Sequence, residues 1–414
     1  MPVSRDRRPA RPAHPARSRM HALRAFGALG ALGALGAATA LVAAPAATAA
    51  PHAPAAPAAP AAPAATAHIH SAAPVFVQSD NPAANTVVAY HRAADGTLSR
   101  AGVYRTGGKG GVLDGSVVDH LASQGSLVLD ARHGLLYAVN AGSDTVTVFA
   151  VHSDRLERVQ VISSGGDFPV GVAVHGNAVY VLNALDGGSI QGFLRIGDRL
   201  VRLPSWHRGL GLDPSAAPQF THTPGQISFT PDGTKLVVTT KAGGNSIEVF
   251  PVGPFGGPAA RPVVTATPDA VPFGFTFDPA GRLQVTEAGP NAVATFTLAR
   301  DGRLTQVGQP VATGQAATCW IVGAGDRLYA SNAGSGSLSG YTVDRHGALS
   351  ALGDTATDGG TVDAAVSSDG RYLYAQTGAA GVVDEFRVGR DGSLTSIGSV
   401  TVPDAVGGEG IAAG

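Results

Sequence analysis

A phrase of about 45 residues recurs along the chain, and it constrains the fold more than any other feature. Each copy has an apolar strand, a turn with glycine, a second strand, a polar turn and a third strand that ends on an aromatic residue. A final turn and a leucine follow. The anchor positions of six second strands lie 43 to 57 residues apart: Tyr137, Tyr180, Val237, Gln284, Tyr329 and Tyr374. Four short strands in such a unit are typical of one blade of a β-propeller.

The two ends of the chain together predict a seventh blade. Residues 75–79, residues 86–90 and the segment from Leu98 match strands two, three and four of a blade that lacks its first strand. Residues 407–413 match a first strand that lacks the others. A ring must close because an open end would leave an unpaired sheet edge. We therefore predict an all-β, seven-bladed propeller of four-stranded blades, closed by the C-terminal strand completing the first blade.

Composition supports this fold and excludes several partners. Charged residues make up only 14%, with 56 Gly and 28 Pro, which disfavours long amphipathic helices. Seven of the 29 basic residues lie within residues 1–50 with a single acid, so the remainder carries a net charge of −7. An acidic body argues against nucleic acid and anionic membranes as partners. The single cysteine, Cys319, excludes an intrachain disulfide and a CxxC-type metal site.

The N-terminus has the layout of a targeting segment. Arginines precede an Ala/Leu/Gly run from about residue 25 to 44, and the small-x-small triplet at 47–49 suits signal peptidase. We predict a signal peptide over 1–49, an Ala/Pro spacer over 50–73 and the propeller over 74–414, in a secreted or cell-surface protein. An uncleaved anchor remains the alternative, and either Met1 or Met20 can be the start.

Two long connections carry candidate ligand-binding side chains. The connection from residue 104 to 124 holds His120, and the one from 204 to 224 holds His207, Arg208 and His222. Both join an outer strand to the inner strand of the next blade, so we expect both on one face of the ring. Loop growth on a rigid scaffold is typical of a binding site, and it is also common without function.

Inner strands line the channel of a propeller, and five polar residues lie near their starts. These are Ser126, Gln226, Thr318, Asp363 and Glu409. Asp363 and Glu409 belong to neighbouring blades once residues 407–413 complete the first one. Two close carboxyl groups can raise one pKa and supply a proton donor, although such residues often only bind water. No Gly-rich phosphate loop, HExxH motif or other metal pattern occurs, and we expect no cofactor and no metal.

The repeat resembles the lactonase family of seven-bladed propellers. The resemblance rests on Phe229-Thr-Pro-Asp-Gly233, Tyr137-Ala-Val-Asn140 with the strand up to Phe149, and Arg300-Asp-Gly-Arg-Leu304. That family includes 6-phosphogluconolactonases and 3-carboxymuconate cyclases, and YVTN-repeat surface proteins share its blade. The resemblance implies the fold over residues 74–414 and a lactone or sugar-acid ligand.

The chain departs from the family at the positions that carry activity. Family members have Pro-Arg-His at the start of an inner strand and Tyr-x-x-Asn-Glu in the next strand. Here Gly225, Gln226 and Lys241 stand at the Arg, His and Glu positions. At these positions the chain therefore lacks the guanidinium and imidazole groups that are best suited to bind an anionic lactone and to transfer its proton. His222, four residues before Gln226, is a possible substitute.

Two functions are consistent with this sequence. The first is an exported enzyme that hydrolyses or isomerises a lactone, with His222, Gln226, Lys241 and Asp363 as catalytic residues. Its substrate-binding residues are predicted to be His120, His207, Arg208, Thr318 and Glu409. The second is a non-catalytic propeller that binds a small molecule or a cell-surface partner. Convergence of His222, Gln226 and Lys241 on one pocket would favour the first, and the sequence does not fix the oligomeric state.

Overall fold

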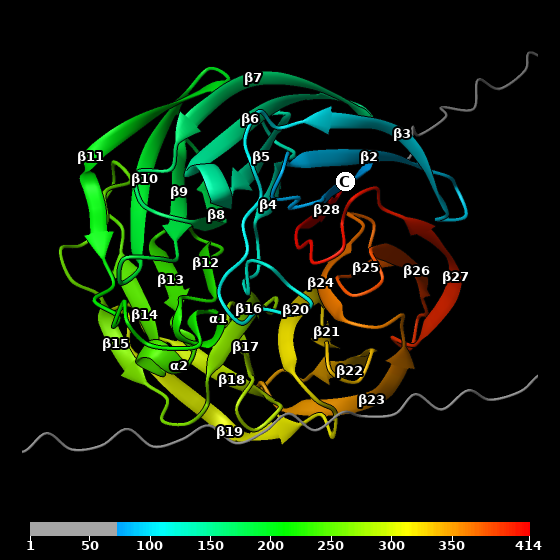
Figure 1. Cartoon of the computed structure of the whole chain (residues 1–414). Helices are drawn as coiled ribbons and strands as arrows, with labels where there is room; N and C mark the ends of the chain where they lie inside the picture. The colour runs from blue at the N-terminus through cyan, green and yellow to red at the C-terminus, as the bar shows by residue number, and fades with distance from the viewer. Residues whose placement is uncertain (1–72) are drawn as a thin grey trace, which may run out of the picture. The chain divides into compact units, whose positions relative to one another are not determined.

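The computed structural model describes residues 73–414, which form seven four-stranded antiparallel sheets in a ring (Figure 1). The first strands of neighbouring sheets contact one another around the centre, so each sheet is a blade that runs from an inner to an outer strand. The predicted seven-bladed propeller is confirmed. The predicted signal segment and nearly all of the predicted spacer lie outside the described residues.

The blades are numbered along the chain, and their strands are given from the inner to the outer one. Blade 1 has β28 (Ile411–Ala413), β1 (Val75–Gln78), β2 (Thr86–Arg92) and β3 (Leu98–Arg105); blade 2 has β4 (Leu127–Asp130), β5 (Leu135–Asn140), β6 (Thr145–His152) and β7 (Arg155–Ser163); blade 3 has β8 (Pro169–His175), β9 (Ala178–Asn183), β10 (Ser189–Ile196) and β11 (Arg199–Gly209); blade 4 has β12 (Gln226–Phe229), β13 (Lys235–Thr239), β14 (Ser246–Pro251) and β15 (Val263–Ala266).

The remaining blades follow the same order. Blade 5 has β16 (Pro272–Phe277), β17 (Leu283–Glu287), β18 (Ala292–Leu298) and β19 (Leu304–Ala312); blade 6 has β20 (Thr318–Ala324), β21 (Arg327–Asn332), β22 (Ser337–Val343) and β23 (Leu349–Ala356); blade 7 has β24 (Thr361–Val366), β25 (Tyr372–Thr377), β26 (Val382–Val388) and β27 (Leu394–Thr401). Three short helical turns are η1 (Ala141–Ser143), α1 (Gln219–His222) and α2 (Lys241–Gly244). Within residues 73–414, no helix is long and apolar enough to cross a membrane.

The core lies between blades, and the second strand of each blade supplies much of it. Every residue of β5 and of β25 is buried, whereas the outer strands β23 and β27 are largely exposed. Buried tyrosines of second strands reach the β-turn between strands three and four of the next blade. Tyr329 Oη donates to the carbonyl oxygen of Gly392 at 2.8 Å, and Tyr374 Oη donates to that of Gly96 at 2.7 Å. Apolar packing and these hydrogen bonds together join neighbouring blades.

The C-terminal strand closes the ring as predicted. Strand β28 pairs with β1 in antiparallel register, with Val75 opposite Ala413 and Val77 opposite Ile411. Blade 1 therefore takes its inner strand from the far end of the chain, and no edge of β1 is left unpaired.

The second long connection is shorter than the sequence predicted. Outer strand β11 continues to Gly209, so the connection begins only after it, at residue 210. His207 pairs with Gln191 of β10, and Arg208 pairs with Ile190. Both lie on the outer strand of blade 3, because the alternating pattern of this segment extends the β-ladder through the residues we had assigned to a loop.

Candidate functional site

Acidic side chains gather beneath one end of the central channel, at the starts of the inner strands. Asp363 lies on β24 of blade 7, and Glu409 immediately precedes β28 of blade 1. The two carboxyl groups lie close enough for the charge of Asp363 to raise the pKa of Glu409, as their places in adjacent blades predicted. The backbone N–H of Glu409 also donates to Asp80 Oδ2 at 2.8 Å, and Asp119 lies close enough to act on the same groups. All four side chains are buried.

Backbone groups and a serine hold this carboxyl cluster (Asp80, Asp119, Asp363 and Glu409) in place. The N–H of Gly125 donates to Glu409 Oε1 at 3.0 Å, and Ser126 Oγ donates to the carbonyl oxygen of Glu409 at 2.8 Å. The N–H of Ala364 donates to Asp363 Oδ1 at 2.9 Å. Glu409 Oε2 is buried and has no hydrogen-bond partner among the described residues. The pair therefore keeps one oxygen free for a proton or a ligand.

Burial favours the protonated forms of these acids, because it raises the pKa of each one. Loss of hydration raises the pKa of Asp80 to about 8 and that of Asp363 to about 7, against the opposing effect of their hydrogen bonds. The pKa of Glu409 is raised well above its ordinary value, first by burial and then by the charges of Asp363, Asp119 and Asp80. Burial raises the pKa of Asp119 to about 6. Adjacent acids whose ionised forms repel are a recurrent arrangement for proton transfer.

The connection between blades 1 and 2 crosses the middle of the ring (Figure 1) and contributes Asp119 to the cluster. We call residues 106–126 the strap; in Figure 1 it is the cyan trace that crosses the middle of the ring between β3 and β4. The backbone N–H of His120 donates to Gly407 O at 2.8 Å, and Ser123 Oγ donates to Val170 O at 2.9 Å. The N–H of Gln124 donates to Gly225 O at 3.0 Å. The strap thus bonds to the segment entering blade 1 and to blades 3 and 4.

The strap also crosses to the far side of the ring. The amide of Gln124 makes two hydrogen bonds with the backbone of Ile321 in blade 6, donating at 2.8 Å and accepting at 3.0 Å. Trp320 Nε1 donates to Ser123 O at 2.6 Å. Neither Gln124 nor Trp320 stood out in the sequence, because a glutamine in a loop and a tryptophan in a strand each have ordinary structural roles there. Only the ring closure brings them together.

Lys241 holds the strap in place by hydrogen bonds from its ammonium group. Its Nζ donates to Ala122 O and Phe220 O, both at 2.6 Å, and to Thr223 Oγ1 at 3.0 Å, so all three N–H groups are used within the protein. Burial lowers the pKa of Lys241 to about 7, against the charge of Asp119, which favours the ammonium.

Gln226, Thr318 and His120 have defined local partners. Gln226 Oε1 accepts from the N–H of Phe275 at 2.6 Å, which joins blades 4 and 5. Thr318 Oγ1 donates to Asn332 Oδ1 at 2.6 Å within blade 6. His120 lies half-buried on the strap, burial lowers its pKa, and its Nδ1 has no partner in the described part of the chain. His120 therefore has a ring nitrogen that makes no hydrogen bond within the described part of the chain.

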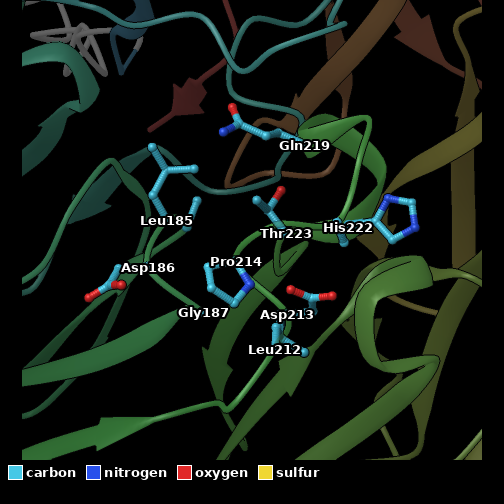
Figure 2. Close-up of a pocket in the computed structure, with 11 residues that line it drawn as sticks. Leu185, Asp186, Gly187, Leu212, Asp213, Pro214, Gln219, His222 and Thr223 are labelled. Carbon is cyan, nitrogen blue, oxygen red and sulfur yellow. The ribbon is translucent and has the colours of Figure 1, made fainter. Parts of the chain in front are cut away.

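The ring of His222 makes its hydrogen bonds locally, at α1, and not to Gln226 or Lys241. Its Nδ1 is bonded to Pro218 O at 3.0 Å and to Thr221 Oγ1 at 2.9 Å, at the end of α1. Figure 2 shows the pocket that it lines with Asp213, and its ring points away from Leu185 and Asp186. Neither Gln226 nor Lys241 lines this pocket, which offers only about 20 Å³ to the centre of a water molecule. That volume suits one or two waters rather than a lactone.

The remaining predicted binding residues are remote from the acids. Arg208 donates to Pro258 O at 2.6 Å and to Ala259 O at 2.8 Å, which fixes its guanidinium against blade 4 at the outer edge. His207 is exposed on the same outer strand. Both were expected in the connection and lie on β11 instead. Within residues 73–414, no group of three or more His, Cys, Asp or Glu is arranged to hold a metal ion.

The sequence analysis did not select Asp80 as a site residue. It follows β1 in the run Ser79-Asp-Asn-Pro82, which is typical of a turn, and its backbone φ of 49° is that of a turn residue. The carboxylate nevertheless faces Glu409, because β28 returns beside β1. The only signal in the sequence was the ring closure itself.

The fold and site define a class of protein, namely a seven-bladed propeller with one end of its channel strapped over buried acids. The family model of the lactonase seven-bladed β-propeller matches residues 284–407. This match, together with the seven-bladed ring, supports the resemblance to a lactonase-family propeller that the repeat predicted.

Solved structures share the fold at low sequence identity. A periplasmic gluconolactonase of Pseudomonas aeruginosa and a protein of Lactobacillus plantarum are each 18% identical, cover 82% of this chain and 98% of their own, and give a TM-score of 0.66. A protein of Bacteroides fragilis provisionally named a 6-phosphogluconolactonase is 20% identical, covers 83% and 98%, and gives 0.64. These identities establish the fold alone. No curated protein sequence matches the chain.

Proposed function

We propose that this lactonase-family propeller hydrolyses a lactone of the sugar-acid class at the strapped end of its channel, with Asp363 and Glu409 as the pair that transfers protons. The observation that carries the proposal is the close approach of the two buried carboxyl groups in adjacent blades, combined with the unpartnered Glu409 Oε2. The gluconolactonase activity named for the Pseudomonas aeruginosa propeller supports the choice of substrate class.

The chemistry needs one ionised and one protonated carboxyl. The ionised member takes a proton from water, the water oxygen bonds to the lactone carbonyl carbon, and the ring C–O bond breaks. The protonated member gives its proton to the departing ring oxygen, so the products are the open hydroxy acid and a pair that again holds one proton. Because burial raises the pKa of Asp363 to about 7, both forms of the pair are available near neutral pH.

Substrate must pass the strap to reach the pair. His120 is the half-buried histidine on this route, and its lowered pKa keeps the ring neutral at pH 7. A neutral imidazole with a free Nδ1 can orient a hydroxyl group of the substrate. The proposal therefore includes displacement of residues 118–124 as a step before the reaction.

A non-catalytic binding propeller is the second candidate. One observation favours it. The strap is held over the channel by the ammonium of Lys241, whose donors are all used within the protein, and by the two hydrogen bonds between Gln124 and Ile321. A closed channel suits a protein that binds its ligand at the rim.

We also propose that the protein acts outside the cytoplasm. The Arg-rich start, the apolar run and the small-x-small triplet at 47–49 support export by a signal peptide. Fractionation of cells that produce the full chain, beside a chain lacking residues 1–49, tests this. Equal retention of both chains in the cytoplasm would contradict export.

The catalytic proposal is tested by acid release in a pH-stat. Glucono-1,5-lactone and dihydrocoumarin are offered to the full chain, with spontaneous hydrolysis subtracted. We expect Asp363→Asn and Glu409→Gln each to lower kcat/KM by at least about 100-fold, because each removes a transferable proton but keeps the side-chain shape. Asp95→Asn, at an exposed turn, is the matched control and should retain activity.

Three results discriminate between the functions. Turnover that is lost only in the pair variants supports the proposal. Loss in His222→Gln with full activity in the pair variants would move the chemistry to the pocket beside α1. No turnover above the blank in folded wild-type protein would favour the binding propeller.

A further inference from the structure

A groove lies between blades 3 and 4 on the face opposite the strap. It is lined by the β8–β9 turn, the β12–β13 turn and residues 252–256 after β14, and its volume is about 440 Å³. In an antiparallel blade these turns lie at the strand ends opposite the connections between blades. The groove is therefore separate from the carboxyl cluster, and its size is within the range of small-molecule sites.

This junction lacks a side chain that occupies the same place at two other junctions of the ring. Arg282 immediately precedes β17. Its guanidinium donates to Asp344 O at 2.7 Å and to Arg345 O at 2.9 Å, in the turn between the third and fourth strands of the next blade. Arg327, at the start of β21, makes the equivalent bond to Arg390 O. Repeat alignment places Ala178 at this position in blade 3. A methyl group replaces a guanidinium, and the groove is the space that remains.

Aromatic rings form the walls of this space. The rings of His175 and Phe229 are 5.5 Å apart between centroids. Phe255, at the tip of the turn Gly253-Pro-Phe-Gly256, is 89% exposed, which is unusual for so large an apolar side chain. Trp206 lies beneath that turn, since a Cβ on Gly257 would stand 3.0 Å from its Nε1.

Besides the imidazole of His175, the polar groups of the groove are uncharged amide, hydroxyl and backbone groups. Asn177 Oδ1 accepts from the Arg195 guanidinium at 2.5 Å, which leaves its Nδ2 as a free donor. Thr234 adds a hydroxyl, and no Asp, Glu, Lys or Arg lines the groove. Since a charged ligand would find no counter-charge in the lining, the groove suits a neutral molecule that has both an apolar face and hydroxyl groups.

We propose that this groove is a binding site for a neutral sugar ring, at the end or within an oligosaccharide. The C–H face of a pyranose would pack on Phe229 and Phe255, because polarised C–H groups favour the negative face of an aromatic ring. The hydroxyl groups at the ring edge would bond to Asn177 and Thr234. The site is independent of the proposed lactone chemistry, and its ligand binds whether or not the channel is catalytic.

Intrinsic fluorescence reports on this site directly. The chain has two tryptophans, and of these Trp206 lies beside the groove while Trp320 is buried at the strap. Cellotriose, maltotriose and N,N′,N″-triacetylchitotriose are titrated into the full chain, and calorimetry repeats any titration that changes the emission. We expect at least one of the three to bind with a saturable change in emission.

Two variants and one control decide the assignment. Ala178→Arg introduces the side chain found at the two junctions of Arg282 and Arg327 and should weaken binding by at least about tenfold. Phe255→Ala removes an exposed ring and should weaken binding without loss of the fold. Ile196→Ala, an exposed apolar residue outside the groove, is the matched control and should bind as the wild type does.

The proposal is overturned if none of the three sugars binds at millimolar concentration. It is also overturned if affinity is unchanged in Phe255→Ala, which decides the matter should Ala178→Arg fail to fold. Lactone turnover is measured in the same variants. Lost sugar binding with unchanged turnover shows two separate sites, so the failure of one proposal remains distinguishable from the failure of the other.

Discussion

The ammonium of Lys241 donates a hydrogen bond to the carbonyl oxygen of Ala122 at 2.6 Å, across 119 residues of sequence. The bond joins α2 of blade 4 to the strap, and Lys241 also binds Phe220 O in the connection before blade 4. Asp119 lies near enough for its charge to stabilise the ammonium. One buried cation therefore holds together the two long connections that the sequence placed on a single face.

Lys241→Met is expected to loosen the strap. The variant leaves the carbonyl oxygens of Ala122 and Phe220 without their donor, and each buried unpaired group costs about 1–3 kcal/mol. We expect a free energy of unfolding lower by about 3 kcal/mol and faster amide exchange over residues 118–124. Lys109→Met, an exposed lysine of the same strap, is the control and should change neither. Unchanged exchange in Lys241→Met would show that the strap is held without this ammonium.

The stability of the protein should fall as the pH rises from 5 to 7. The pKa values of Asp80, Asp363 and Glu409 are raised by burial, so between their ordinary values and the raised ones the folded state binds more protons than the unfolded state. Stability therefore decreases with pH across that window. The lowered pKa of His120 acts in the opposite direction below about pH 6.5 but is a single group. The lowered pKa of Lys241 opposes the trend only above about 7. Denaturant unfolding at pH 5, 6 and 7 measures the slope.

Asp80→Asn tests the origin of that slope. The amide imitates the protonated acid, so the free energy of unfolding of the variant should depend less on pH than that of the wild type. The stability of the variant relative to the wild type should therefore increase towards pH 8. Asp95→Asn is the matched control, because the pKa of Asp95 is shifted in the opposite direction to that of Asp80. The side-chain and backbone hydrogen bonds of Thr97 lower the pKa of Asp95, so its ionised form stabilises the fold only above about pH 4. A pH slope that survives in Asp80→Asn would assign it to other acids.

The sequence predicted the blades because their determinants are local. Alternating apolar residues, glycine turns and the Tyr-x-x-Asn phrase define each second strand, and the ends of the chain could only pair with each other. The predicted end of β11 was wrong by six residues, 204–209, for the same reason. Trp206 and Arg208 continue the strand, while the sequence from Pro204 onward has the turn-forming composition of a loop.

The site was less predictable, because its partners come from several blades. The adjacency of Asp363 and Glu409 followed from ring closure, and the structure bears it out. The three donors of Lys241 and the crossing of Gln124 to Ile321 depend on how the strap turns over the channel, which no local pattern encodes. His222 was predicted as a site residue because it lies only four residues before Gln226 in the sequence. In the structure, its ring bonds to Pro218 O, just before α1, and not to Gln226.

A chain that ends at Val402 should lose its closed ring. The deletion removes β28, exposes the edge of β1 and takes away Glu409 from the carboxyl cluster. We expect a melting temperature well below that of the full chain. Ile411→Ala is the graded companion: Ile411 is buried opposite Val77, and the truncation of a buried isoleucine costs about 2–5 kcal/mol. Equal melting temperatures of the shortened and full chains would refute the closure.

Two buried tyrosines form a matched pair for the junctions between blades. Tyr374 Oη donates to Gly96 O at 2.7 Å, whereas Tyr137 Oη, at the same position of blade 2, has no partner among the described residues. Tyr374→Phe should lower the free energy of unfolding by about 1–2 kcal/mol, since it leaves the carbonyl of Gly96 unpaired. Tyr137→Phe removes a hydroxyl that is buried without a bond, so its stability should be unchanged or slightly higher. Chemical denaturation of both variants beside the wild type measures the difference. Equal losses would mean that the hydroxyl bonds contribute nothing specific and that ring packing alone joins the blades.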